Sequence, residues 1–338
     1  LEEERLKYTL RLARLLAELP GPRVRSISTL AGRFEPRGYA EMPHEVGQRL
    51  GAQLGALARG LAELEERTGV CVRVALEPEP GTTLERTSDA VSFFERYVWL
   101  AEPLSARYIG LCYDTCHQAV MFEEPREAWG RLREAGVPVF KVQLSNSLEL
   151  LTPRSREGRA QLASFMEPRY LHQVTAYTQE GRVKRLLDLP TLLTPTGELK
   201  EGFEGWAEAR SWRCHFHVPI FLQAVGALRT TQSAIEPALR RAVRLPHAFI
   251  EVETYAWAQL PEPAAPITKA PFKFIGALRM LVANRAFLNV TLLVLIVTIG
   301  EVFRQTITVF FARDIVGVTN IGIIYFCYFV AALAVMPG

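Results

Sequence analysis

Cysteine is scarce in this chain, and its five copies show no paired spacing. They are Cys71, Cys112, Cys116, Cys214 and Cys327. A disulfide scaffold and a zinc ribbon both need cysteines in pairs at characteristic separations, so the pattern excludes both. Most of the five fall in expected strands, which predicts reduced cysteines in the core of a cytosolic domain.

An excess of charge is also missing from most of the chain. The 338 residues carry 39 Lys and Arg against 36 Asp and Glu, a formal net charge of +3. The segment from Ala264 onward holds six of the basic and two of the acidic residues, which leaves 33 basic and 34 acidic residues before it. A nucleic-acid-binding surface usually needs clustered positive charge. Nucleic acid is therefore not an expected partner.

The amino terminus lacks a signal peptide and an initiator methionine. The chain begins at Leu1, inside a stretch with the apolar period of an amphipathic helix. We expect an incomplete amino terminus, with the first strands of the fold missing.

Short apolar runs alternate with helical patterns through the first 260 residues. Expected strands cover residues 24–30, 72–76, 108–113, 139–144, 212–216 and 247–252, and helical patterns separate most of them. Such alternation predicts a parallel sheet with crossover helices, an α/β architecture. Residues 150–210 are less regular, and we expect them to form an insertion over the mouth of a (β/α)8 TIM barrel.

Side chains of the kinds that bind metals follow several of these strands. Glu77 follows the second strand, Gln143 ends the fourth, and Glu253 follows the last. The carboxyl ends of all strands in a TIM barrel converge on one face. The repetition therefore predicts a single site at that face.

The run from Tyr113 to His117 is the centre of this pattern. Asp114 and His117 stand three residues apart at the end of a strand, so both can turn into the barrel mouth. They could bind one divalent metal, or one could hold the metal while the other contacts substrate. The alternative is an Asp helix cap with a surface histidine.

The other histidines offer further ligands. His215 and His217 alternate around Phe216 and can face the same side of a strand. The alternative for this pair is a hydrogen-bonded structural role in a polar core. His172 lies on an irregular segment, and metal binding and a structural role remain open for it.

The carboxyl-terminal region has a different composition. A proline-rich basic linker covers residues 261–275, and two long apolar runs follow at 289–311 and 320–336. Each apolar run is long enough to cross a bilayer, so we expect residues 276–338 to form two transmembrane helices. The part in contact with the membrane would be residues 287–336. Basic residues before the first run place the barrel on the cytoplasmic side. The alternative is a pair of buried core helices.

Six strings in the first 260 residues resemble a known family. They are LEPEPG at 76–81, CYDTCHQAV at 112–120, KVQLS at 141–145, EPRYLHQV at 167–174, HFHVPI at 215–220 and EVETY at 251–255. Together they resemble EboE, a family of metabolite traffic proteins among the xylose-isomerase-like TIM barrels. Residues 114–117 alone are similar to the endonuclease IV motif. The tail resembles the start of a glycoside–pentoside–hexuronide transporter of the major facilitator type.

The resemblance implies roles for individual residues. Glu77, Asp114, His117 and Glu253 would bind a divalent metal such as zinc, manganese or iron, with Glu253 preferred to Glu251. Gln143 stands where the family often has histidine, so His172, His215 or His217 would supply the missing imidazole. Glu77, His117 and Glu253 would be the catalytic residues of an enzyme of this kind.

Three functions remain open on the sequence alone. The resemblance implies metabolite handling, with a small organic metabolite and other Ebo-type proteins as partners. A metal-dependent sugar isomerase or epimerase is the first alternative, because metal, carboxylate and imidazole suit proton transfer beside a polarised oxygen. An endonuclease IV-like enzyme is the second. Residues 1–260 are the predicted domain for each of them.

Overall fold

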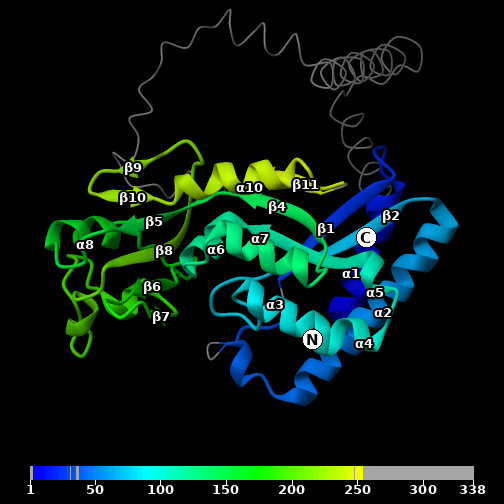
Figure 1. Ribbon diagram of the computed structural model, residues 1–338, viewed down its shortest axis with the longest axis horizontal. Coiled ribbons are helices and arrows are strands. Elements are labelled where there is room, and N and C mark those ends of the chain that lie inside the picture. The colour runs from blue at the N-terminus through cyan, green and yellow to red at the C-terminus, as the bar shows by residue number, and fades with distance from the viewer. Residues whose placement is uncertain (1–2, 31, 36–37, 247, 254–338) are drawn as a thin grey trace, which may run out of the picture. The chain divides into compact units, whose positions relative to one another are not determined.

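The computed structural model describes residues 3–30, 32–35, 38–246 and 248–253 (Figure 1). The chain divides into two units, Leu1–Ala265 and Pro266–Gly338. All of the described residues belong to the first unit, and the fold below is the fold of that unit.

Five parallel strands form a curled sheet in the order β1-β2-β3-β4-β11 (Figure 1). Their bounds are β1 Val24–Leu30, β2 Cys71–Glu77, β3 Ile109–Asp114, β4 Val139–Leu144 and β11 Phe249–Val252. Asp114 pairs in register with Gln143, which in turn pairs with Glu251. The carboxyl ends of these neighbouring strands therefore lie side by side, and the residues that follow them gather at one edge.

Helices pack against this sheet and enclose the largest hydrophobic core among the described residues. The helices of this layer are α1 Glu3–Glu18, α2 His44–Thr68, α3 Thr87–Phe93, the π-helical turn η2 Phe94–Val98, α4 Trp99–Ala101, α5 Ser105–Tyr108, α7 Pro125–Glu134 and α10 Ile235–Ala242, with the 3₁₀ turns η1 Tyr39–Glu41 and η4 Gln232–Ala234 beside them. The short helix α6 Thr115–Val120 follows β3 and packs mainly on strands outside this sheet. A glycine in α2 permits a close approach between α2 and η2. A Cβ atom on Gly51 of α2 would lie 2.3 Å from the carbonyl oxygen of Tyr97 in η2.

The remaining strands form a second, antiparallel sheet in the order β7-β6-β8-β5-β10-β9. Its elements are β5 Asn146–Leu150, β6 Val174–Tyr177, β7 Val183–Leu186, β8 Ser211–Val218, β9 Ala224–Val225 and β10 Leu228–Thr230, with α8 Arg156–Ala163, α9 Leu189–Leu192 and the 3₁₀ turn η3 Glu204–Trp206. This sheet has its own core, in which Trp212 is fully buried and donates its indole N–H to the carbonyl oxygen of Trp206 at 2.9 Å.

The predicted (β/α)8 TIM barrel is wrong. Strand β8, which was expected in the barrel, pairs antiparallel with both β5 and β6. Only Ser145 separates β4 from β5, whereas a parallel crossover needs a dozen or more residues. Strands β4 and β11 pair directly with each other, so among the described residues the parallel sheet has five strands and two open edges, β1 and β11.

The predicted membrane-inserted tail is also corrected. Among the described helices, none is long and apolar enough to cross a bilayer. The longest, α2, spans 25 residues, but it is amphipathic and exposes charged side chains such as Arg49 and Arg59. The two spans expected within 287–336 and the similarity to a transporter lie outside the described residues. The expected position of residues 1–260 on the cytoplasmic side of a membrane depended on those spans and therefore has no support.

Candidate metal centre

Asp114 connects the parallel sheet to helix α6. It is the last residue of β3, and its Oδ1 atom accepts the backbone N–H groups of Cys116 at 2.7 Å and of His117 at 2.9 Å. This capping begins the helix directly after the strand and fixes His117 in its first turn. The second oxygen, Oδ2, is buried and has no hydrogen-bond partner among the residues that the structure describes. Asp114 is thus a helix cap and also presents a free carboxylate oxygen, while His117 is buried rather than on the surface.

Three buried imidazoles meet through their Nε2 atoms. The Nε2 atom of His215 lies 3.1 Å from that of His117 and 2.9 Å from that of His217. His215 and His217 are alternate residues of β8, so both side chains leave the same face of the antiparallel sheet. That face therefore lies against the carboxyl end of β3 in the parallel sheet.

The Nδ1 atom of each of these imidazoles has its own hydrogen-bond partner. His117 contacts the carbonyl oxygen of Pro78 at 3.1 Å, His215 contacts Oε1 of Gln173 at 2.7 Å, and His217 contacts Oγ of Ser145 at 2.8 Å. Gln173 is itself fixed, because its Nε2 atom donates to the carbonyl oxygen of Pro80 at 2.9 Å. Metal-binding histidines are typically oriented in this way, by a second hydrogen bond from the ring nitrogen that does not bind the metal.

The hydrogen-bond partners of the Nδ1 atoms decide which ring nitrogen carries the proton, and they leave the Nε2 lone pairs of His117 and His215 facing one another. The Pro78 carbonyl and the Gln173 amide oxygen can only accept, so the neutral rings of His117 and His215 carry their protons on Nδ1. Their Nε2 lone pairs then face each other across 3.1 Å. Such an arrangement is favourable when a cation lies between the nitrogens or when one ring is protonated.

The electrostatic environment separates the pKa values of the three rings. Burial lowers the pKa of His117, but Asp114, Glu77 and Glu79 outweigh burial and raise it to about 9. Burial, together with repulsion from His117, lowers the pKa of His215 well below its ordinary value. For His217 burial lowers the pKa to about 4. The cluster therefore holds its proton on His117 when no metal is bound.

Three carboxylates form a second group beside the imidazoles. Glu77, Asp114 and Glu253 each have an oxygen within 4.8 Å of the others. Burial, then repulsion from Asp114, raises the pKa of Glu77 to about 7 and that of Glu253 to about 8. Burial alone would raise the pKa of Asp114, but attraction to His117 and His217 lowers it.

Asp114 belongs to both groups. Its carboxylate oxygen also lies within 4.8 Å of ligand nitrogens of His117 and His217. The possible metal ligands are therefore three imidazole nitrogens and three carboxylates. Asp114 belongs both to the carboxylate group and to a group with His117 and His217. Crowded carboxylates in a buried site are costly unless a cation or protons compensate their charge, and this composition fits a divalent metal of the zinc, manganese or iron type.

Six of the eight expected metal ligands thus come together in the structure. They are Glu77, Asp114, His117, His215, His217 and Glu253. The other two lie close by but belong to none of the ligand groups: Gln143 accepts a hydrogen bond from the thiol of Cys112 at 2.8 Å, and the ring of His172 stacks on Phe216. Glu251 is separate as well, since its carboxylate pairs with Lys141 at 2.8 Å.

Several residues of the site were not singled out from the sequence. Glu79 groups with His117 and His215, and Cys116 groups with His215 and His217. The alternation of Glu77 and Glu79 between prolines was a usable signal for Glu79. Ser145 and Gln173 carry no such signal, because a hydrogen bond to an imidazole can come from almost any polar residue.

A cavity of about 280 Å³ opens beside the imidazoles. His215, His217 and Glu79 form part of its wall, and His172 lies in the same wall. Phe34 and Tyr170 also line it, and both rings are about half exposed. A cavity of this size, whose wall combines apolar side chains with polar and charged ones, suits a small molecule.

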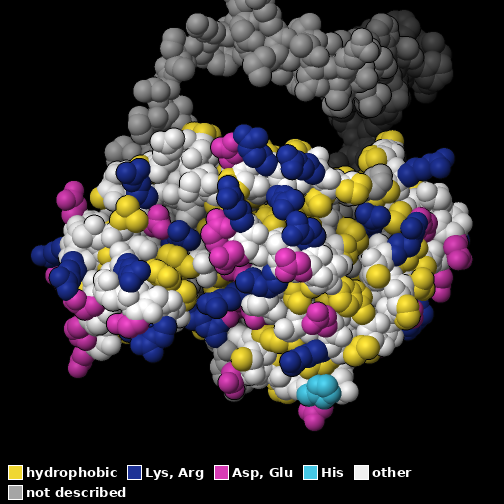
Figure 2. All heavy atoms as spheres, viewed as in Figure 1, with side chains coloured by type: hydrophobic (Ala, Val, Ile, Leu, Met, Phe, Trp, Pro, Cys, Tyr) yellow, Lys and Arg dark blue, Asp and Glu magenta, His cyan; other side chains and the backbone are white. Residues whose placement is uncertain are grey.

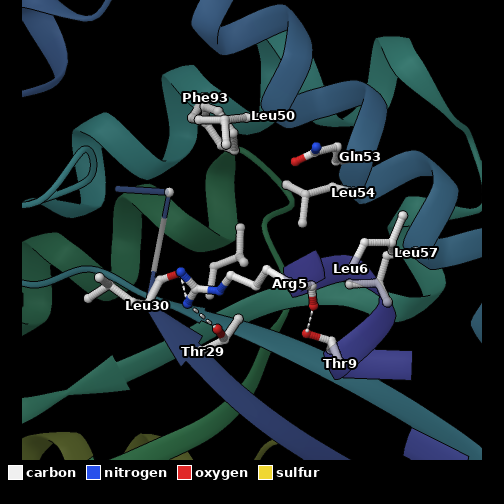
Figure 3. Close-up of a pocket in the computed structure, with 12 residues that line it drawn as sticks. Arg5, Leu6, Thr9, Thr29, Leu30, Leu50, Gln53, Leu54, Leu57 and Phe93 are labelled. Carbon is white, nitrogen blue, oxygen red and sulfur yellow. Dashed lines mark hydrogen bonds between the residues drawn. The ribbon is translucent and has the colours of Figure 1, made fainter. Parts of the chain in front are cut away.

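A second cavity, of about 50 Å³, lies between α1, β1 and α2 (Figure 3). Its walls are mainly leucine side chains, and Arg5 crosses it to reach Oγ1 of Thr29 at 2.6 Å. None of its lining residues is a histidine, cysteine or carboxylate. The larger cavity, and not this one, adjoins the candidate metal centre.

Comparison with known proteins leaves the family open: no family model matches the chain, and no curated protein matches its sequence.

Proposed function

We propose that this protein binds a divalent metal through His117, His215 and His217, with Asp114 and the neighbouring carboxylates, and that it handles a small polar metabolite in the adjoining cavity. The observation that carries the proposal is that the Nε2 atoms of His117 and His217 both lie within 3.1 Å of the Nε2 atom of His215, while every Nδ1 atom is engaged elsewhere. Without a metal ion, the arrangement needs a proton on His117 to keep the Nε2 lone pairs from facing one another.

The distances between the imidazole nitrogens support this assignment. A tetrahedral metal with metal–nitrogen bonds of about 2.0–2.1 Å separates its ligand nitrogens by about 3.4 Å. The observed separations of 2.9 and 3.1 Å are a few tenths of an ångström shorter. Small movements of the rings would admit the ion, and Glu77, Asp114 and Glu253 would compensate its charge.

A bound metal would supply Lewis-acid chemistry at the inner end of the cavity. The residues of the chain then have distinct tasks. Gln173 and Ser145 hold the imidazoles in position, and Phe34 and Tyr170 offer apolar surface for the body of a ligand. Glu79, in the cavity wall, is placed to receive or return a proton of that ligand. These tasks suit the metabolite-handling role that the resemblance to EboE implies, and an isomerase or epimerase reaction is its enzymatic form.

A second candidate is a metal-dependent hydrolase of the endonuclease IV type. The overlap of the two ligand groups at Asp114 favours it, because a bridging carboxylate can serve more than one metal ion. The number of bound ions separates the two candidates: one equivalent supports metabolite handling with a single centre, and two or three support hydrolysis.

The test is the metal content of the full chain by elemental analysis after exposure to zinc, manganese or iron and removal of free ions. We expect at least one tightly bound equivalent of metal in the unaltered protein. We expect His215→Asn to reduce the retained metal by about tenfold or more, because mutation of a residue that only hydrogen-bonds to a metal ligand already lowers metal affinity by about 10- to 100-fold.

His172→Asn is the matched control, because His172 is buried nearby but belongs to none of the ligand groups. It should retain the metal of the unaltered protein. Equal metal content in both variants, or no bound metal in the unaltered chain, would contradict the proposal.

A further inference from the structure

A groove between α7 and α10 gathers arginines on the surface of the helix layer. It has a volume of about 510 Å³, and the charged residues that line it are Arg126, Arg240, Arg241, Arg244 and Glu236. Four guanidinium groups and one carboxylate give this lining a net charge of +3. Figure 2 shows Lys and Arg side chains gathered over the part of the molecule where Figure 1 places these two helices. We call this feature the arginine groove.

Most of this charge has no counter-ion in the described part of the protein. Arg240 pairs with Glu236 one turn earlier on α10, through Nε at 2.9 Å. Within the described part of the chain, no carboxylate lies within 4.0 Å of the guanidinium groups of Arg126, Arg241 or Arg244. Three such cations therefore share one concave surface.

The helices place these cations at some energetic cost. Arg240 and Arg241 lie in the last turn of α10 and Arg244 lies just beyond its end at Ala242, so three like charges repel one another within a short stretch of chain. The negative carboxyl end of α10 offsets part of that cost, but Arg126 stands in the first turn of α7, where the helix dipole disfavours a cation. Core packing does not require them either, because α10 buries other residues, Ile235, Ala238 and Ala242.

The wall of the groove also contains a donor without a partner among the described residues. Trp129 lines it, is 6% exposed, and its buried Nε1 atom has no hydrogen-bond partner. Its ring is not available for stacking a ligand, since it packs on Tyr113 with ring centroids 4.6 Å apart. The groove thus combines the positive charge of its guanidinium groups with apolar surface from Pro125, Trp129 and Pro237.

We propose that the arginine groove binds a small molecule that carries two or more linked phosphate groups. Guanidinium groups match the oxygens of phosphate in paired hydrogen bonds, and several phosphates are needed to balance a net charge of +3. The concave shape and the volume fit a small ligand. None of the residues that line the groove belongs to the ligand groups, so this inference does not depend on the proposed metal centre.

The experiment is calorimetric titration of the full chain with tripolyphosphate and, separately, with orthophosphate, at physiological ionic strength. The protein is treated with a chelator and dialysed first, because tripolyphosphate binds metal ions. We expect tripolyphosphate to bind at least about tenfold more tightly than orthophosphate. We also expect the double variant Arg241→Gln, Arg244→Gln to weaken tripolyphosphate binding by about tenfold or more, as loss of charge-assisted hydrogen bonds requires.

A double variant on another helix provides the control for net charge. Arg11→Gln with Arg14→Gln on α1 removes two exposed positive charges outside the groove and should leave the affinity for tripolyphosphate unchanged. Equal weakening by both double variants would mean a non-specific charge effect and would overturn the proposal. Absence of tripolyphosphate binding would also overturn it, and binding to vesicles that contain phosphatidylserine would then identify the groove as a membrane contact.

Discussion

The two sheets contribute different ligands to the candidate metal centre, and they do so by different geometry. The carboxylates Glu77 and Asp114 stand at the carboxyl ends of parallel strands, and Glu253 directly follows one. His215 and His217 are alternate residues within one antiparallel strand. Parallel strands bring their ends together because all of them point the same way, whereas neighbouring antiparallel strands point in opposite directions. In this protein the antiparallel sheet supplies both of its imidazoles from one face of β8, because alternate residues of a strand point the same way.

The centre also lies between two separate hydrophobic cores. One core joins the parallel sheet to its helices, and the other surrounds Trp212 in the antiparallel region. Neither sheet alone provides the complete set of ligands. The integrity of the centre therefore depends on both cores and on how they are held together.

The largest expected effect comes from breaking the antiparallel core. Trp212→Ala removes a fully buried indole and its hydrogen bond to Trp206, so we expect the free energy of unfolding of that region to fall by about 3–5 kcal/mol. Hydrogen exchange followed by mass spectrometry measures the change by region. Protection should fall more in β5, β6 and β8 than in β2 and β3. A uniform loss across both sheets would show a single cooperative unit and refute the separation of the two cores.

A smaller effect is expected from disturbing the parallel region. Gly51→Ala would place a Cβ atom 2.3 Å from the carbonyl oxygen of Tyr97, so α2 and η2 must move apart. Overpacking of this kind costs about 1–3 kcal/mol of unfolding free energy, measurable by urea denaturation. Gly130→Ala in α7 is the control, because a Cβ atom there has no atom within 4 Å. That change should stabilise the helix by about 0.5–1 kcal/mol. Similar effects of both substitutions would contradict the close contact.

The smallest expected effect is a change in the pH dependence of stability, and it arises from an ion pair between α2 and α5 in the parallel region. Hydrogen bonds from Arg107 lower the pKa of Glu65, whose carboxylate also accepts the hydroxyl of Tyr108 at 2.7 Å. The ionised form therefore stabilises the fold above the ordinary pKa of a glutamate, and this contribution is lost as the pH falls through the lowered pKa.

Glu65→Gln should accordingly reduce the loss of stability between about pH 5 and about pH 3. Arg107 is 54% exposed, so solvent screening limits the difference to less than about 1 kcal/mol. Urea denaturation across this pH range measures it, with Glu63→Gln, an exposed neighbour on α2, as the control. An acid dependence that is the same for Glu65→Gln and the unaltered protein would exclude this ion pair as a source of pH sensitivity.

Local elements were predictable because their causes are local. The expected strands at 24–30 and 139–144 are β1 and β4. Hydrophobic periodicity and stop residues act over a few positions, so they can be read without knowing the rest of the fold.

Pairing between strands was not predictable in the same way. The run 212–216 has the composition of a buried strand, and it is one, but its composition does not reveal that its neighbours run antiparallel. The irregular segment between residues 150 and 210 provides one of those neighbours, β6. Partners that lie dozens of residues away are selected by the packing of the whole domain, and a single sequence gives little information on that choice.

For this protein, the sequence by itself determined which side chains can form a metal centre, because Asp114 and His117 flank a strand end and His215 and His217 alternate on one strand. Only the tertiary structure decided which of them meet: Gln143 and His172 turn to other partners, while Glu79 joins the group. The physical reason is distance along the chain. Residues close in sequence share one element and its geometry, but the contact between His117 and His215 spans 98 residues and exists only because the two sheets pack against each other.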